Sequence, residues 1–378
     1  VDQINIDAQV RNPGGNIDLT EISIHPFSFR LAENPFSLTA DIKTPVSDPD
    51  FTAEAKGVLN LGMIKQVYPL DDMELNGTVR ADMTMAGHLS YIEKEQYDRF
   101  SASGTIALSD MKLKMKEMPD VEIKKSLFTF TPKYLQLSET TVAIGKNDLT
   151  ADCRFENYMG YALKGSTLKG TLNVRSNHLN LNDFMTATTD STAQTSQASS
   201  TEETVSMIEV PQNIDFQMDA GLKEVLFDKM TFTNMNGKLI VKDGKVDMTN
   251  LSMNTMGGSV VMNGYYSTAD PKKPEMNAGF RMENIGFAQA YKELDMVQQM
   301  APIFENLKGN FSGNMHIRTL LDNQMSPVMD TMQGSGSLST QDLSLSGVKV
   351  IDQIAEAVKK PELKEMKVKD MALDFTIK

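Results

Sequence analysis

The stretch Met111-Lys112-Leu113-Lys114-Met115-Lys116 alternates an apolar residue with a lysine at every step. Because successive side chains of a β-strand point to opposite faces, this stretch predicts a strand with one apolar and one solvated face. Strands of parallel sheets are covered on both faces and read as continuous apolar runs. The alternation therefore favours an antiparallel sheet.

The same period of two returns along the whole chain. Its apolar positions include Ile4-Ile6-Ala8-Val10, Val79-Ala81-Met83-Met85, Leu149-Ala151-Cys153-Phe155, Phe216-Met218-Ala220-Leu222 and Leu373-Phe375-Ile377. Turn signals separate these segments, among them Asn76-Gly77, Asp243-Gly244 and Asn263-Gly264. We therefore predict a mostly β fold built from a twisted antiparallel sheet.

Helical spacing of apolar residues is confined to short segments. The residues Phe287, Tyr291, Leu294 and Val297 predict a helix over 287–307 that breaks before Pro302. A second amphipathic helix is predicted near 350–359, and shorter helical turns at 62–68 and 181–185. Several of these segments follow a strand and precede another, which indicates a repeated strand-helix-strand unit and an elongated architecture.

One segment differs from the rest in composition. From Thr186 to Thr204, 11 of 19 residues are Ser or Thr, and none is Gly, Pro or aromatic. Such a segment cannot bury enough apolar surface to offset its ordering cost. We interpret 186–209 as a flexible linker or insertion between an N-terminal part, 1–185, and a C-terminal domain, 210–378.

Composition excludes several classes of protein. The 378 residues carry a net charge of -13, which argues against a nucleic-acid partner that would need a basic face. No apolar run approaches the roughly 18 residues needed to cross a bilayer. Since the sequence begins at Val1 and has no signal peptide, we expect it to be a trimmed piece of a longer protein.

Catalytic and metal-binding patterns are not found in the sequence. The histidines His25, His88, His178 and His316 lie tens of residues apart, without the spacing that brings two imidazoles to one metal. The single cysteine, Cys153, alternates with apolar neighbours, and a buried thiol in such surroundings is inert. We therefore expect no enzyme, no cofactor and no metal.

Two lysine-rich segments allow two interpretations. The strand with Lys112, Lys114 and Lys116 and the mixed run 359–369 could contact anionic headgroups. Lysine on exposed strands also discourages aggregation at sheet edges. The interpretation as a solvated face is favoured for both.

The strands pose a packing problem. Their apolar faces cannot all remain in water, since burial is worth about 25 cal/mol per Å². The sheet can pack on a second sheet, close into a barrel, or curl into a trough whose apolar floor meets a ligand. Periodicity alone favours the sandwich. The 27 methionines and the lack of tryptophan favour an adaptable lining.

The C-terminal half resembles a known family. The motifs that carry the resemblance are Asp215-Phe216-Gln217-Met218-Asp219-Ala220, Val241-Lys242-Asp243-Gly244-Lys245-Val246, Gly334-Ser335-Gly336-Ser337-Leu338 and Ile351-Asp352-Gln353-Ile354-Ala355. Their order is similar to the C-terminal region of AsmA-like proteins, relatives of the TamB and bridge-like lipid-transfer group. The match is best from about 210 to 378 and looser across 1–185.

The resemblance implies a long antiparallel sheet curled into an apolar groove that carries phospholipid acyl chains. It implies a periplasmic location, an N-terminal inner-membrane anchor absent from this sequence, and a role in lipid transport between inner and outer membranes, with outer-membrane components as further partners. The expected lining residues are apolar strand positions: Met83, Met85, Phe216, Met218, Leu239, Val241, Met248, Met253 and Met262. The alternative is an envelope scaffold or outer-membrane assembly factor with a filled β-sandwich core.

Overall fold

The computed structural model describes residues 2–31, 33–66, 73–94, 96, 99–115, 119–185, 208–323 and 325–378. The chain divides into two compact units. Unit 1 comprises Val1–Arg175 together with Asn213–Phe216, and unit 2 comprises Ser176–Gln212 and Gln217–Lys378. Most of the linker predicted over 186–209 lies outside the described residues, as do the last two positions of the helical turn predicted at 62–68.

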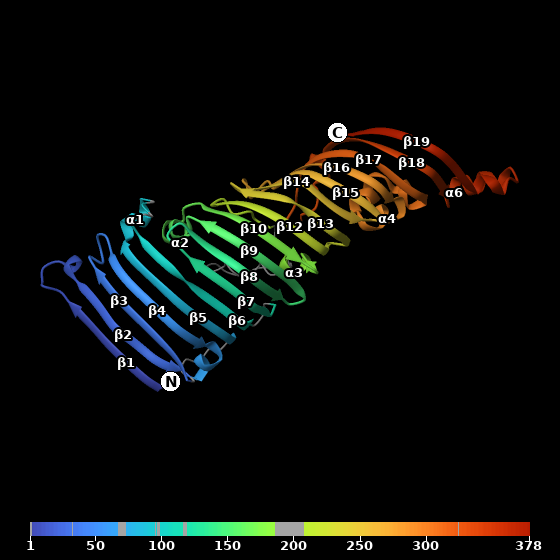
Figure 1. Cartoon of the computed structure of the whole chain (residues 1–378). Helices are drawn as coiled ribbons and strands as arrows, with labels where there is room; N and C mark the ends of the chain where they lie inside the picture. Colours follow the sequence, from blue (N-terminus) through green and yellow to red (C-terminus); the bar gives the residue numbers. More distant parts are fainter. Residues whose placement is uncertain are drawn as a thin grey trace, which may run out of the picture. The chain divides into compact units, whose positions relative to one another are not determined.

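Unit 1 is an antiparallel meander in which each strand pairs with the next along the chain (Figure 1). Its strands are β1 Asp2–Arg11, β2 Glu21–Leu31, β3 Asn34–Lys43, β4 Asp50–Asn60, β5 Met73–His88, β6 Ser101–Met115, β7 Val121–Phe130, β8 Tyr134–Ile144, β9 Asn147–Glu156 and β10 Leu168–Ser176, which runs one residue past the unit boundary.

Short helices occupy some of the connections in unit 1. They are the 3-10 helices η1 Ile17–Leu19 and η2 Leu61–Gln66 and the α-helices α1 Leu89–Glu93 and α2 Tyr158–Lys164. Ile92 of α1 and Met159 of α2 pack with Phe100 and Ala102 in a small buried cluster. This cluster caps one end of the sheet and leaves the middle of the strands without a second layer in the described part of unit 1.

Unit 2 is also mostly antiparallel, and β13 to β19 pair in chain order. A short parallel pair joins β11, Leu179–Asn180, to β12, Ile214–Phe227, a strand that begins in unit 1. The remaining strands are β13 Met230–Lys242, β14 Lys245–Thr255, β15 Gly258–Ser267, β16 Glu275–Gly286, β17 Leu307–Leu320, β18 Gln333–Ser346 and β19 Glu365–Ile377.

The helices of unit 2 interrupt this meander at a few connections. They are α3 Asn182–Met185, α4 Phe287–Glu293, α5 Asp295–Met300, η4 Pro302–Asn306, η5 Met329–Thr331, α6 Lys349–Ala357 and η6 Pro361–Lys364. The segment α4–α5–η4 connects β16 to β17 and folds back onto the sheet. Proline at the first positions of η4 and η6 suits a helix start, because proline fixes φ and needs no hydrogen-bond partner there.

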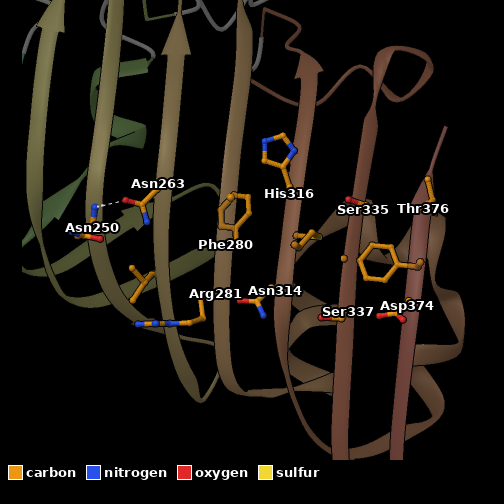
Figure 2. Close-up of a pocket in the computed structure, with 15 residues that line it drawn as sticks. Asn250, Asn263, Phe280, Arg281, Asn314, His316, Ser335, Ser337, Asp374 and Thr376 are labelled. Atoms are coloured by element: carbon orange, nitrogen blue, oxygen red, sulfur yellow. Dashed lines mark hydrogen bonds between the residues drawn. The ribbon is translucent and has the colours of Figure 1, made fainter.

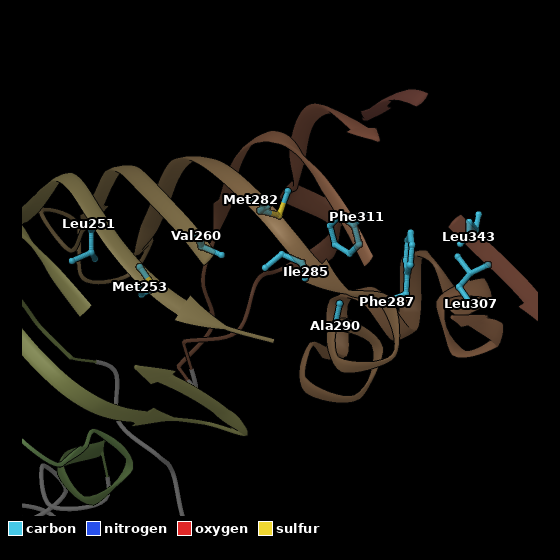
Figure 3. Close-up of a cluster of buried hydrophobic side chains, with 10 residues drawn as sticks. All are labelled: Leu251, Met253, Val260, Met282, Ile285, Phe287, Ala290, Leu307, Phe311 and Leu343. Atoms are coloured by element: carbon cyan, nitrogen blue, oxygen red, sulfur yellow. The ribbon is translucent and has the colours of Figure 1, made fainter. Parts of the chain in front are cut away.

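The main hydrophobic core lies under this helical segment (Figure 3). Phe287 of α4 contacts Phe304 of η4 and Phe311 of β17, with ring centroids 4.9 Å apart in each pair. The strands contribute the other buried members: Leu251, Met253, Val260, Met282, Ile285, Leu307 and Leu343. Helices α4 and η4 therefore fill one end of the apolar side of unit 2.

The prediction of a mostly β, antiparallel fold with few short helices is confirmed. The helix predicted over 287–307 is divided into α4, α5 and η4, with the last break at Pro302 as expected. Helix α6 confirms the prediction near 350–359. The sequence did not predict α1 and α2, which are only 5 and 7 residues long. An apolar residue recurs too few times in such short helices for a period to be visible.

Candidate functional site: an apolar sheet face

One side of the unit 1 sheet is apolar on every strand. A single row of residues in register crosses all ten strands and defines this side, which we call the apolar face of unit 1. The row consists of Ile6, Phe27, Leu38, Ala55, Met83, Gly104, Phe130, Leu135, Phe155 and Gly170. None of these ten residues is buried: Ile6 is exposed and the other nine are half-buried.

The half-burial has a simple geometric cause. Side chains on the same face contact one another, for example the rings of Phe27 and Phe29, which are 5.5 Å apart. Lateral contacts of this kind cover the flanks of a side chain and leave its end uncovered. The exposure of Ile6, 61%, marks the outer strand β1, where one flank is uncovered as well.

Unit 2 has a corresponding apolar side. The row Leu239, Met248, Gly264, Ala278, Ile317, Gly334 and Ile377 crosses β13 to β19 in register and defines the apolar face of unit 2. A second row on this face starts with Met253, Val260 and Met282, all of which are buried in the cluster that includes Phe287 and Ala290 of α4. Towards β19 the face opens again, and Leu373 is 51% exposed.

The structure places the nine expected lining residues on these apolar sides as follows. Met83 and Met85 lie half-buried on the apolar face of unit 1, and Phe216 contacts Phe155 there at 5.6 Å. Met218 is half-buried two residues further along β12. The other five are on the apolar face of unit 2: Leu239, Val241, Met248, Met253 and Met262. Of these, Met253 and Val241 are buried.

Backbone bulges decide how some of these residues come together. Met248 and Met253 are five positions apart, so strict alternation would place them on opposite faces. Asn250 lies between them with φ 48°, and the register shifts there by one residue. A bulge of this kind inserts one residue and restores both methionines to the same face. Asp110, with φ 51°, does the same between Leu108 and Met111 in β6, where the register with β5 shifts by one residue.

The opposite side of unit 1 is charged and internally paired. Lys112 and Lys114 of β6 form ion pairs with Glu122 of β7 and with Asp120, which directly precedes β7, at 2.9 and 3.5 Å. The hydrogen bond from Lys112 lowers the pKa of the exposed Glu122 carboxyl. These lysines lie on an inner strand with acidic partners, which supports the interpretation of this strand as a solvated face. Lys116 lies outside the described residues.

Polar groups on the apolar face of unit 1 satisfy one another. Ser126 and Thr140 are both buried, and their hydroxyls are 2.7 Å apart in a hydrogen bond. Cys153 is buried between Leu137 and Leu172 on the neighbouring strands, and burial raises the pKa of its thiol. A thiol held protonated in this way is a poor nucleophile and a poor metal ligand. No cluster of three or more His, Cys, Asp or Glu suited to a metal occurs among the described residues.

A shallow depression of about 710 Å³ lies in unit 2 (Figure 2). It is lined by polar rows in register on the side opposite the apolar face, with Arg281, Asn314, Ser337 and Asp374 on four successive strands. The depression is open, and Arg281 lies 3.9 Å from Glu283 in an exposed ion pair. His316 and Asp374 both line the depression, but they belong to β17 and β19, with β18 between them. We therefore take the apolar faces as the candidate site.

Sequence reasoning missed most of the residues on the apolar face of unit 1. Phe27, Leu38, Phe130, Leu135 and Phe155 belong to the row that crosses the sheet. The signal was present, since each of them alternates with polar or small neighbours. What the sequence does not give is the register that aligns these strands into one row.

No protein-family model, curated protein or solved structure matches the chain. No helix in the described ranges is both long enough and apolar enough to cross a membrane.

Proposed function

We propose that the chain binds phospholipid acyl chains on its apolar sheet faces. The acyl chains would move along the apolar rows, from one strand to the next. The observation that carries this proposal is the half-buried row of unit 1, ten strands wide, which meets no second layer in the described part of that unit. A hydrocarbon chain would supply the cover that the protein itself does not.

The energetics suit reversible binding. Removing one methylene from water is worth about 0.8 kcal/mol, and a bilayer offers the same gain. Transfer from a membrane to an apolar face can therefore be nearly balanced. Flexible methionines such as Met83 and Met85 adapt to chains of different length and unsaturation. The paired charges on the opposite side of the sheet keep that side in water, so headgroups would stay at the solvent edge.

The cellular setting is part of the proposal and rests on the AsmA-like resemblance described above. It would place the protein in the periplasm, anchored to the inner membrane in its full-length form, where it contributes to lipid transport between the inner and outer membranes. Movement would be passive sliding, with no covalent step, which agrees with the inert Cys153 thiol.

The proposal is tested by lipid content. The purified chain is analysed by native mass spectrometry and by extraction of bound lipid, together with Met83→Arg and its matched control Thr84→Arg. Met83 lies on the apolar face, and Thr84 is exposed on the opposite side of the same strand. We expect bound phospholipid in the parent chain and in Thr84→Arg and at least about a tenfold loss in Met83→Arg, because a guanidinium stays charged in apolar surroundings. Recovery of lipid-free parent protein under mild conditions would refute the proposal.

A filled-core scaffold remains the second candidate for one specific reason. In unit 2 Met253, Val260 and Met282 are buried in one cluster with Phe287 and Ala290 of α4, so part of that apolar face is closed by the chain's own side chains. A role in envelope assembly would need no lipid. A folded parent chain that carries no lipid would favour this candidate.

A further inference from the structure

Helix α6 carries an aliphatic stripe that faces solvent. Val350, Ile354 and Val358 follow one another at intervals of four residues, so they lie on one side of the helix. Their exposed fractions are 63%, 52% and 51%. The neighbouring apolar residues Ile351 and Ala355 are half-buried and buried, which shows that the helix already uses a different side to pack against the protein.

Lysines surround this stripe. Lys349 precedes Val350, and Lys359 and Lys360 follow Val358 directly; all three are exposed. The acidic residue of α6 on the solvent side, Glu356, is occupied by an ion pair with Lys364 at 2.7 Å, and that hydrogen bond lowers the pKa of the glutamate. The other acidic residue of α6, Asp352, is half-buried. Residues 349–360 carry three lysines against these two acidic residues, one of which is paired with Lys364, so the charge around the stripe is net positive in a chain whose net charge is -13.

We infer that this stripe and its lysines dock on an anionic phospholipid surface. A helix with an aliphatic side and flanking lysines lies in the plane of a membrane interface, with its apolar residues below the headgroups and its ammonium groups at the phosphates. Charge complementarity selects this occupant. A second copy of the acidic chain would meet the lysines at one small patch only, whereas an anionic bilayer presents phosphate along the whole helix.

The docking surface does not depend on the proposed acyl-chain function. It uses residues of α6 and the segment after it, none of which belongs to the apolar rows of either sheet face. The two proposals can therefore be told apart. A chain that carries bound lipid but does not bind vesicles would refute only the docking surface, and a lipid-free chain that binds vesicles would refute only the acyl-chain function.

The experiment measures co-sedimentation of the full chain with unilamellar vesicles made of equal parts phosphatidylglycerol and phosphatidylcholine, and with vesicles of phosphatidylcholine alone. We expect binding to the anionic vesicles only. Ile354→Asp should weaken it at least about tenfold by placing a charge in the inserted stripe. The double variant Lys359→Glu/Lys360→Glu should weaken it about thirtyfold and reduce its dependence on salt.

Two controls match these variants. Lys272→Glu/Lys273→Glu changes the same charge at another pair of adjacent exposed lysines in unit 2, and Val46→Asp places a charge on an apolar residue that is 64% exposed in unit 1. Both should bind within about twofold of the parent chain, since neither changes a residue of the stripe or one of the lysines that flank it. Unchanged circular dichroism would establish that the variants fold.

Three results would overturn the inference. The first is no binding of the parent chain to anionic vesicles. The second is an equal loss in the lysine variant and its control, which would mean that net charge alone governs binding. The third is a parent chain that self-associates through the stripe, becomes monomeric as Ile354→Asp and does not bind vesicles, which would identify a second copy as the occupant.

Discussion

Units 1 and 2 share one sheet design and differ in what covers it. In both, an apolar row crosses successive antiparallel strands in register. Among the described residues, only six apolar side chains are buried in unit 1, against nineteen in unit 2. The difference comes from the connections: α1 and α2 cap one end of unit 1, whereas α4, α5 and η4 fold over the strands of unit 2.

The composition of each face and the covering of that face have different causes. Alternation and bulges decide which residues share a face. The inserts between strands decide whether that face is covered. A sheet of this kind can therefore be opened or closed locally without changing its strands, and the proposed function places the acyl chain on the row of unit 1 that the described helices leave uncovered.

The largest expected contrast concerns the removal of an aromatic ring. Phe287 of α4 is 2% exposed in the core of unit 2, and Phe128 is half-buried on the apolar face of unit 1. We expect Phe287→Ala to lower the free energy of unfolding by about 3–5 kcal/mol, since it leaves a cavity. Phe128→Ala should cost only about 1–2 kcal/mol. Urea denaturation followed by circular dichroism measures both, and equal losses would mean that the face of unit 1 is enclosed.

Adding volume sharpens the same contrast. Ala278 has 0% exposure on the apolar face of unit 2, whereas Ala55 is half-buried in the central row of unit 1. Ala278→Leu should destabilise by about 1–3 kcal/mol through overpacking. Ala55→Leu should stay within about 0.5 kcal/mol of the parent, because its larger side chain can extend outward. Thermal melting of the two variants measures the difference. A melting temperature lowered equally in both would contradict the open face.

Buried hydroxyls give a third contrast, of opposite sign. Thr140 of unit 1 hydrogen-bonds to Ser126, while the buried Oγ1 of Thr255 in unit 2 has no partner among the described residues. Thr140→Val should cost about 1 kcal/mol, since it leaves the Ser126 hydroxyl unpaired. Thr255→Val should be neutral or stabilise by up to about 1 kcal/mol, because it removes an unsatisfied group. A destabilisation at both positions, seen in the same urea experiments, would reject this account.

The smallest expected effect depends on pH. Burial raises the pKa of Glu293 in α4, an effect that Lys292 partly offsets, and its Oε2 has no partner in the described part of the chain. The folded chain then holds this proton more tightly than the unfolded chain, so the ionised carboxylate destabilises the fold at neutral pH. Glu293→Gln should add a few tenths of a kcal/mol at pH 7, and the gain should vanish as the pH falls below the ordinary glutamate range.

A matched control is the exposed Glu305 of η4. Melting temperatures of Glu293→Gln and Glu305→Gln, measured from neutral to acidic pH, should separate only at neutral pH. A gain for Glu293→Gln that persists at acidic pH would show that charge is not its cause.

The sequence predicts the strands well because the alternation of apolar and polar residues can be seen within each strand by itself. Residues 111–115 fall within β6, and Asp243-Gly244 forms the turn between β13 and β14 as predicted. The turns predicted at Asn76-Gly77 and Asn263-Gly264 are wrong: both pairs lie inside strands, β5 and β15, the first of them at a bulge. The helix break at Pro302 is also predictable, because proline cannot continue the preceding helix.

The sequence does not predict the rows and the covering layer. At Asp110 and Asn250 a bulge changes which residues of the strand lie on the apolar face. Each bulge depends on a single residue with positive φ, which appears in the sequence only as a break in the alternation. The row that joins Ile6 to Gly170 depends on nine strand registers. Met253 is buried in a cluster that includes residues of β15 to β18 and of α4, so its burial depends on distant parts of the chain. Long-range packing therefore decides which expected residues are open and which are closed.

The most direct test of the central claim places a photoreactive benzoylphenylalanine at Met83 and, separately, at Thr84 in cells that make the protein. The two positions are neighbours on β5 and face opposite sides of the sheet. The account predicts a lipid adduct after irradiation at Met83 and none at Thr84. Absence of a lipid adduct at Met83, or equal adducts at both positions, would contradict it.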